Sequence, residues 1–378
     1  SHTDVHSAYA AVNGIRVDDL KPHIYRTQDD GKHWIEIVQG LDNMPINVVK
    51  EDPQRKGLLF AGSETQVYVS LDDGDHWQSL RLNMPATSIR DLVIKDDDLV
   101  VATHGRSFWI LDDISSLRQL TPQLTKSKNI LFTPQLTYRV RWNMNTDTPL
   151  PQEEPAGQNP PDGAIVNYYL DQSVKNISLE ILDSKSQIIR KYSNLDTLYK
   201  IPNVNIPNYW IRPQQILSVE KGSHRFLWDL HYDPLNVPPS YPISAIYNNT
   251  APDKTSPWIM PGEYTIVLNV DGISYLQKMS VKMDPRVKTS LKNLQLQHDL
   301  SMKCYTNILS IQKLVIEHQL SSEQEKEAST FSANFITLQK LLQESDQKPT
   351  NKLAKEVQNK ENEFKAWIKK EKIEGITK

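Results

Sequence analysis

The residues best suited to bind a ligand lie in the motif ATHGRSFW, which contains His104, Gly105 and Arg106. Gly105 allows a sharp backbone turn, and the Arg106 guanidinium can hold a carboxylate through two parallel hydrogen bonds. We therefore expect His104 and Arg106 to face a ligand. An alternative remains open, in which Arg106 forms a structural ion pair with a nearby carboxylate such as Asp91 or Asp112.

Carboxylates near this motif do not form an obvious catalytic pair. A glycoside hydrolase of the usual type needs two carboxyl groups about 5–9 Å apart, and the sequence offers Asp91, Asp112 and Asp113. Asp112 and Asp113 are adjacent, so on a strand their side chains face opposite sides. A sialidase-like site would also need an arginine cluster and a tyrosine nucleophile. We predict no catalytic residues in this chain.

Metal and cofactor motifs are weak. His2, Asp4 and His6 alternate and could share one strand face as zinc ligands, but they lie at a terminus that can fray. Asp96–Asp98 lacks the ligand spacing of a calcium loop and fits a hairpin turn better. Cys304 is the single cysteine, so neither a disulfide nor a zinc-thiolate cluster can form within the chain. We predict no metal and no cofactor.

Two segments repeat the pattern Ser/Thr-x-Asp-x-Gly-x-x-Trp, in IYRTQDDGKHW and VYVSLDDGDHW. Their equivalent aspartates are one blade length apart (72 − 29 = 43), since a propeller blade repeats every ~40–50 residues. In such a turn the carboxylate accepts backbone amides, the glycine supplies positive φ and the tryptophan packs beneath. The predicted structural residues are Thr27, Asp29, Gly31, Trp34, Ser70, Asp72, Gly74 and Trp77.

A third, degenerate copy follows, in which Asp113 takes the place of Asp72 but neither the glycine nor the tryptophan is present. An inner strand of this blade would aim the His104–Arg106 loop near the propeller's central channel. Propellers close with 4–8 blades, and residues 1–121 supply fewer than three. We expect the missing N-terminal blades to come from sequence before Ser1 or from another chain, because open sheet edges invite aggregation.

These motifs resemble a family of large bacterial Asp-box (BNR) β-propeller proteins, described as sortilin-like or as glycosyl hydrolases. The resemblance continues through NPPDGAIVNYYL, GSHRFLWDLHY, PGEYTIVLNVDG and VKMDPRV and covers most of residues 1–300. It implies an extracytoplasmic location, periplasmic, cell-surface or secreted, although no signal peptide is visible in the sequence. The family includes receptors as well as hydrolases, so the resemblance does not fix the activity.

The expected fold is mainly β with a helical tail. After the blades of 1–121 we predict a Pro-rich linker at 122–163, an immunoglobulin-like β-sandwich at 164–285 and a helical tail or three-helix bundle at 286–378. Alternating residues in HRFLWDLHY and EYTIVLNV indicate the strands. Ser322 and Glu325 fit a helix capping box.

The composition excludes two partner classes. A net charge of −3 argues against a broad face for nucleic acid, and no apolar run reaches the ~18–20 residues that span a bilayer. The leading hypothesis is a non-catalytic binding or scaffold protein that recognises a peptide or glycan. One alternative is the C-terminal part of a glycoside hydrolase, sialidase- or xyloglucanase-like, with its catalytic residues mostly in missing blades. Another is an adaptor that uses the helical tail.

Overall fold

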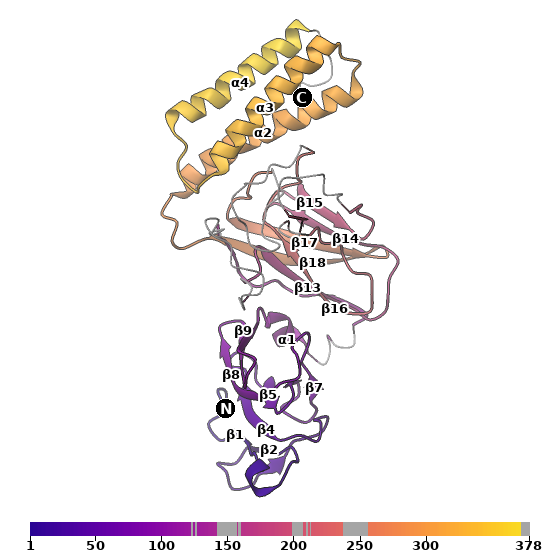
Figure 1. The fold of residues 1–378 in the computed structure, drawn as a ribbon, viewed down its shortest axis with the longest axis vertical. Coiled ribbons are helices and arrows are strands. Elements are labelled where there is room, and N and C mark those ends of the chain that lie inside the picture. Colours follow the sequence, from indigo (N-terminus) through magenta and orange to yellow (C-terminus); the bar gives the residue numbers. More distant parts are fainter. Residues whose placement is uncertain are drawn as a thin grey trace. The chain divides into compact units, whose positions relative to one another are not determined.

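The computed structural model describes residues 1–121, 124, 127–141, 157, 160–198, 207, 208, 211, 213–236 and 256–371. The chain forms two compact units, Ser1–Lys128 and Asn129–Lys378. The first contains β-sheets, and the second contains β-sheets followed by helices (Figure 1). The expected mainly-β chain with C-terminal helices is therefore confirmed.

The first unit consists of three consecutive antiparallel sheets. The first sheet has β1 (Ala8–Ala11), β2 (Ile24–Thr27) and β3 (Ile35–Glu36), with a 3-10 turn η1 (Ile15–Val17) between β1 and β2. The second has β4 (Ile46–Glu51), β5 (Leu59–Ser63), β6 (Val67–Ser70) and β7 (Gln78–Ser79). The third has β8 (Ile89–Lys95), β9 (Asp98–Thr103) and β10 (Phe108–Leu111), followed by helix α1 (Ser115–Gln119).

Apolar side chains join these sheets face to face. One buried cluster lies between the first and second sheets and includes Ile24, Ile37 and Trp77. A second lies between the second and third sheets and includes Phe60 and Leu92. Strand β4 contacts both β1 and β8, so the strands that begin the sheets lie next to one another. This stacking, sheet after sheet in chain order, is the arrangement of propeller blades.

The second unit begins with a two-layer β-sandwich. Its smaller sheet has the order β11 (Asn129–Leu131), β13 (Ala164–Leu170), β16 (Gly222–Trp228). The larger has the order β12 (Thr137–Arg139), β18 (Ile273–Met283), β17 (Gly262–Val270), β14 (Ile177–Leu182), β15 (Ile188–Ser193). Both contribute to one core around Trp228. The pair β12–β18 is parallel, and the immunoglobulin-like topology stays a prediction.

Part of the range expected to be a linker is structured. Strands β11 and β12 lie within 122–163, and each pairs with a strand far away in sequence. Leu131 and Thr137 are buried there. Short strands of this kind derive their stability from distant partners rather than from local composition. The rest of the predicted linker, at 122, 123, 125, 126, 142–156, 158 and 159, lies outside the described residues.

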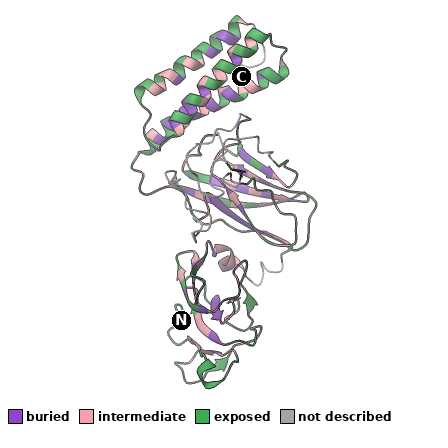
Figure 2. Cartoon of the chain, viewed as in Figure 1, coloured by how far each residue is buried: buried purple, intermediate pink, exposed green. Residues whose placement is uncertain are grey.

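Three amphipathic helices complete the second unit: α2 (Leu291–Glu317), α3 (Ser322–Gln343) and α4 (Asn351–Lys370). Their buried sides share one core, which includes Phe335 and Phe364, while the outer sides are exposed (Figure 2). The capping box of α3 uses Ser321 and Gln324. The Ser322/Glu325 prediction was therefore wrong by one position, since Ser321 is the residue with extended backbone that caps the helix.

Candidate functional site

The two Asp-box turns are built alike. The hydroxyl of Thr27 donates to Asp29 Oδ1 at 3.0 Å and accepts the amide of Gly31 at 3.0 Å. The second turn repeats these bonds. The Ser70 hydroxyl donates to Asp72 Oδ1 at 2.9 Å and accepts the amide of Gly74 at 2.9 Å. Both glycines have φ in the left-handed region, +79° and +91°, which explains why glycine is needed at this point of the turn.

Each turn also contains a histidine that was not predicted from the sequence. The amide of His33 donates to Asp29 Oδ1 at 2.9 Å, and its ring Nδ1 lies 2.6 Å from Asp29 Oδ2. His76 makes the same two contacts with Asp72. The signal was present in the sequence, because both repeats end in His-Trp. Hydrogen bonds from the His33 amide and ring lower the pKa of Asp29 to about 2.

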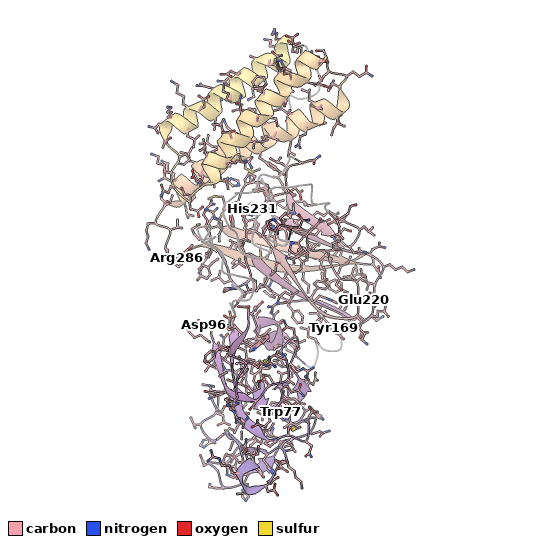
Figure 3. The ribbon with its side chains drawn as sticks, viewed as in Figure 1. Trp77, Asp96, Tyr169, Glu220, His231 and Arg286 are labelled. Atoms are coloured by element: carbon pink, nitrogen blue, oxygen red, sulfur yellow. The ribbon has the colours of Figure 1, made fainter. Side chains whose placement is uncertain are left out.

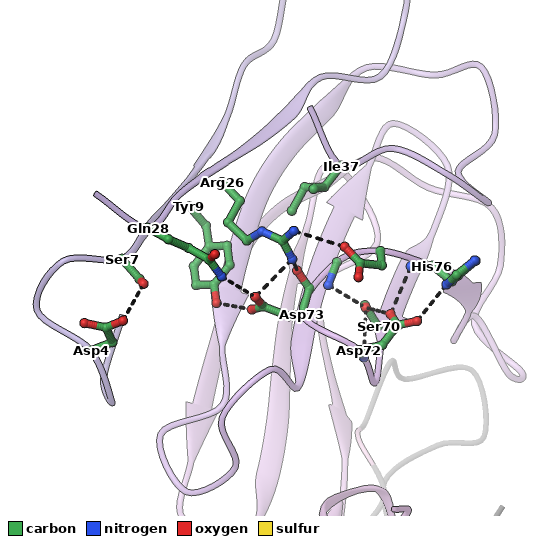
Figure 4. A network of polar contacts seen from close by, with 12 residues as sticks. Asp4, Ser7, Tyr9, Arg26, Gln28, Ile37, Ser70, Asp72, Asp73 and His76 are labelled. Carbon is green, nitrogen blue, oxygen red and sulfur yellow. Dashed lines mark hydrogen bonds and ion pairs between the residues drawn. The ribbon is translucent and has the colours of Figure 1, made fainter. Parts of the chain in front are cut away.

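The second turn is also bound by the preceding sheet. The Asp73 carboxylate accepts hydrogen bonds from Tyr9, Arg26 and Gln28, which lie on or beside β1 and β2 (Figure 4). Arg26 also pairs with Asp75 at 3.1 Å. The indole N–H of Trp77, labelled in Figure 3, donates to the carbonyl of Ile37 at 2.8 Å. The Asp box of one sheet thus forms part of its junction with the previous sheet.

The third copy ends in a helix instead of a hairpin. Asp113 is buried with φ in the left-handed region, and its carboxylate accepts the amide of Ser115 at the start of α1. Arg118 on α1 pairs with the fully buried Asp52 at 2.9 Å. Asp96 lies at the tip of the β8–β9 hairpin, as Figure 3 shows, which agrees with the turn expected for Asp96–Asp98.

A polar cluster occupies the opposite end of the sheets, which we call the rim. Its members lie on or directly beside strands of all three sheets: Asn13, Asn47, Glu64, Ser88 and Arg90. Asn47 is the centre of the cluster. Its side-chain amide donates to Glu64 Oε1 at 3.0 Å and to the Ile89 carbonyl at 2.9 Å, and its oxygen accepts from Asn13.

Two β-bulges place the rim side chains. Asn47 is the extra residue of a bulge in β4, and Arg90 is the extra residue of a bulge in β8. The two positions are equivalent in the repeat. A bulge bends its strand and re-aims the side chain, and both of these side chains reach the carboxylate of Glu64, with Arg90 at 3.3 Å.

Glu64 is an ionised group in this setting. Burial alone would raise its pKa, but hydrogen bonds from Ser88 and Asn47 and the charge of Arg90 outweigh burial and leave the pKa below its ordinary value. A general acid needs a raised pKa so that it carries a proton near neutral pH. The electrostatics of Glu64 therefore do not suit the acid role of a hydrolase.

The His104–Arg106 loop adjoins the rim and is held firmly by its backbone. The His104 amide donates to the Ser88 carbonyl at 2.8 Å, the Arg106 amide to Thr103 Oγ1 at 3.1 Å, and the Trp109 indole to the Arg106 carbonyl at 2.9 Å. The side chains of His104 and Arg106 are exposed. Within the described part of the chain, the Arg106 guanidinium has no ion pair and no hydrogen bond.

The structural pairing considered for Arg106 is thus not observed, and Asp91 lies 3.7 Å from Lys50 instead. The predicted residues fall into two groups at opposite ends of the sheets. Thr27, Asp29 and their repeat equivalents lie in the turns that follow β2 and β6, whereas His104 and Arg106 lie where β9 meets β10. Asn47, Glu64 and Arg90 were not predicted, because bulges and contacts between sheets leave no local sequence signal.

The second unit has a charged groove of about 910 Å³ beside a buried ion-pair cluster. The buried carboxylate of Asp346 lies 2.6 Å from Arg139, the last residue of β12, and 2.9 Å from Arg141, two residues further along the chain. Arg286, labelled in Figure 3, lines the groove and pairs with Asp284 at 2.6 Å. These contacts join the sandwich to the helices, so we assign the cluster a structural role.

Other site types find little support among the described residues. No three or more His, Cys, Asp or Glu side chains there are grouped to hold a metal ion. No helix in the described ranges is long and apolar enough to cross a membrane. Burial raises the pKa of the Cys304 thiol to about 12, which keeps it protonated and unreactive.

Comparison with known proteins gives distant structural likenesses only. No protein-family model and no curated protein matches the chain. It is similar to a GH74 enzyme of Niastella koreensis, with 13% identity and a TM-score of 0.25, over 44% of this chain and 27% of that one. It is also similar to YCF48 bound to D1 peptide, with 14% identity and a TM-score of 0.19, over 43% of this chain and 44% of the other.

A third similar structure is CopC from Methylosinus trichosporium OB3b, with 11% identity and a TM-score of 0.17, over 32% of this chain and 79% of that one. The chain thus spans less than half the length of the GH74 enzyme and of YCF48. At such low identity and TM-score the likenesses do not assign an activity to this chain.

Proposed function

We propose that this chain is the non-catalytic binding and scaffold portion of an extracytoplasmic Asp-box propeller protein. Its rim recognises a peptide or glycan that carries a carboxylate. The Asp-box turns hold the sheets together and take no part in recognition. His104 and Arg106 are the ligand-facing residues, and Asn47, Glu64 and Arg90 position the ligand's polar groups beside them.

The observation that carries this proposal is the free guanidinium of Arg106. It is exposed and unpaired within the described residues, while its backbone is fixed by Thr103 and Trp109. Because the backbone of this loop is already fixed, ligand binding costs little additional conformational entropy of the loop. A planar guanidinium matches a carboxylate bidentately. His104 offers a second polar group two residues away.

The lowered pKa of Glu64 suits a hydrogen-bond acceptor and argues against the general-acid role in hydrolysis. An ionised Glu64 held by Asn47 and Arg90 can accept hydrogen bonds from ligand hydroxyls or amines, but it has no proton to give. Asp91, one of the three carboxylates considered for hydrolysis, lies 3.7 Å from Lys50 on β4 and is largely exposed. Glu64 therefore does not supply the general acid that the hydrolase alternative needs.

The test uses the full chain and matched probes. Binding is measured by calorimetric titration against peptides with a free C-terminal carboxylate or an amide, and against glycans with an acidic sugar or its neutral counterpart. Arg106→Ala should weaken binding of the carboxylate probes about 10–200-fold. Arg106→Lys should restore part of it. Lys32→Ala removes one positive charge at the opposite end, beside the first Asp box, and should leave binding unchanged.

Two results would contradict the proposal. Equal affinity of Arg106→Ala and the unaltered chain for every probe would remove Arg106 from recognition. Turnover of the glycan panel, lost on Glu64→Gln, would replace the scaffold function with hydrolysis.

A further inference from the structure

The charged groove of the second unit lies where two segments of the chain meet. Residues 284–289 lead from β18 into α2, and residues 344–347 follow α3; Arg141 from beyond β12 also lines the groove. Its volume of about 910 Å³ is in the range of sites that hold small molecules. The groove belongs to the second unit and the rim to the first, so the two share no residue.

The buried ion-pair cluster beside the groove has more positive than negative charge. Arg139 and Arg141 share the carboxylate of Asp346, at 2.6 and 2.9 Å, and no other carboxylate of the described residues pairs with either arginine. The ring of Trp258 faces both guanidinium groups at 5.9 and 5.3 Å, but it carries no counter-charge. A buried charge without a counter-charge is unfavourable, so this cluster favours an additional anion.

Arg139 shows the effect of this imbalance. It is 3% exposed, and its Nε is buried without a hydrogen-bond partner. Burial lowers the pKa of its guanidinium, and although Asp346 acts in the opposite direction, the charge of Arg141 lowers the pKa further. The single carboxylate therefore does not fully compensate the two arginines.

Cationic donors in the groove keep unused hydrogen-bonding capacity. Arg286 directs Nε and Nη2 to Asp284, which leaves its Nη1 without a partner among the described residues. Lys288 donates to the Pro285 carbonyl at 2.8 Å and has no carboxylate partner there. An ammonium group has three donors and a guanidinium has five. Arg286 and Lys288 are also exposed, so a ligand in the groove can reach them.

Two helices begin directly after the segments that line the groove. Ser290 caps α2 and Thr350 caps α4, and neither helix has an acidic residue in its first turn. Helix α3 runs in the opposite direction (Figure 1), and its first turn contains Glu323 and Glu325. A helix N-terminus carries about half a positive charge. The starts of α2 and α4 therefore add to the positive potential that the arginines create.

One carboxylate opposes an anion in the groove. Asp284 and Asp346 are each paired with arginine, whereas Glu344 is exposed and has no ion pair among the described residues. Glu344 thus offers a variant that should strengthen anion binding, in contrast to variants of the cationic donors.

We propose that this groove binds a phosphate or sulfate group, with Lys288, Arg286 and Arg141 as its cationic donors. A phosphate or sulfate ester presents three terminal oxygens as acceptors, one for each donor side chain, whereas a carboxylate presents two. Its negative charge compensates the excess at the buried arginines. Because the donors come from the sandwich and from the start of α2, the bound group links these two parts and stabilises the second unit.

The test is calorimetric titration of the full chain at constant ionic strength, held with chloride. The probes are inorganic phosphate, sulfate and glucose 6-phosphate, with acetate as the carboxylate comparison. Lys288→Gln should weaken binding of the three oxyanion probes about 5–20-fold. Glu344→Gln should strengthen it about 2–5-fold, an effect that impaired folding cannot produce. The matched control is Lys326→Gln, an exposed lysine of α3 near its start, which should leave affinity unchanged.

The probes also separate the sources of the bound group. Tighter binding of glucose 6-phosphate than of phosphate supports a small ester as the ligand, and equal binding supports the free ion. Acetate that binds as tightly as phosphate and sulfate would overturn the proposal, as would equal affinity of the Lys288 and Glu344 variants and the unaltered chain.

Arg106→Ala distinguishes this groove from the rim. Oxyanion binding that survives Arg106→Ala and falls with Lys288→Gln supports the groove, even if carboxylate recognition at Arg106 fails. The reverse pattern would place the oxyanion at the rim and overturn the proposal. Thermal unfolding gives a second readout: phosphate should raise the midpoint most for Glu344→Gln and least for Lys288→Gln, and an equal rise in both would contradict a bound group in the groove.

Discussion

The indole N–H of Trp77 donates to the carbonyl oxygen of Ile37 at 2.8 Å, from the Asp box of one sheet to the sheet before it. The bond is buried, so it satisfies two polar groups that water cannot reach. We predict that Trp77→Phe lowers the free energy of unfolding of the first unit by about 2–4 kcal/mol. Trp34→Phe should cost less than about 0.5 kcal/mol, because Trp34 lacks both burial and the bond. Urea denaturation of the two variants checks this, and equal losses would contradict it.

The two Asp-box glycines should differ in the same direction. Gly31→Ala forces a side chain into positive φ and should cost about 1 kcal/mol. Gly74→Ala adds a collision with Ile37 to the same strain and should cost several times as much, about 3 kcal/mol. The difference in unfolding midpoint measures the packing contribution of the sheet junction. A smaller loss for Gly74→Ala than for Gly31→Ala would show that the junction is looser than described.

The first unit should lose stability in acid. The folded pKa of Asp29 is about 2, below the ordinary value of 3.8, and that of Asp72 is also lowered. A depressed folded pKa contributes stability above the unfolded pKa, and this contribution is lost as pH falls through the folded pKa. We expect the loss between about pH 4 and pH 2. Asp29→Asn should flatten this part of a stability-against-pH curve, while Asp18→Asn, at an exposed loop position, should leave it unchanged.

Asp346 should be the most sensitive charged residue of the second unit. It is buried with Arg139, so Asp346→Asn leaves two arginine charges without their counter-charge. We predict a loss of about 3–5 kcal/mol in the free energy of unfolding. Lys313→Ala removes an exposed helix pair with Glu317 and should cost below about 0.5 kcal/mol. Guanidinium titrations of both variants provide the comparison, and similar midpoints would contradict it.

Cys304 gives a probe of the helices. Its thiol is fully buried and its pKa is raised to about 12, so it should react with a thiol reagent only when α2 leaves its neighbours. We expect the labelling rate of the folded chain at pH 8 to be several orders of magnitude below that of the unfolded chain. A rate near that of the unfolded chain would show that the helical core opens readily.

The sequence was most informative where structure is local. Each Asp-box turn is closed by residues within seven positions, so its glycine and carboxylate could be assigned from spacing. The helices followed from their apolar periodicity for the same reason. The capping box was displaced by one residue, because Ser321 and Ser322 are both good caps and only backbone geometry distinguishes them.

Features that depend on distant pairing were not predictable. The bulges at Asn47 and Arg90 arise from the register of β4 with β5 and of β8 with β9. Strand β12 pairs in parallel with β18, which lies more than a hundred residues away. None of the rim residues could therefore be predicted, whereas His104 and Arg106 in the adjoining loop could, because a glycine marked the turn.

The position of Asp346 has a consequence for how the second unit denatures. Its carboxylate contacts Arg139 and Arg141, its carbonyl accepts the hydroxyl of Thr289, and it lies between α3 and α4. Separating the helices from the sandwich would break the ion pairs of Asp346 with Arg139 and Arg141 and would leave these charges without their partners. The two halves should therefore melt in a single cooperative transition, with a calorimetric enthalpy suited to the whole unit rather than to two independent domains.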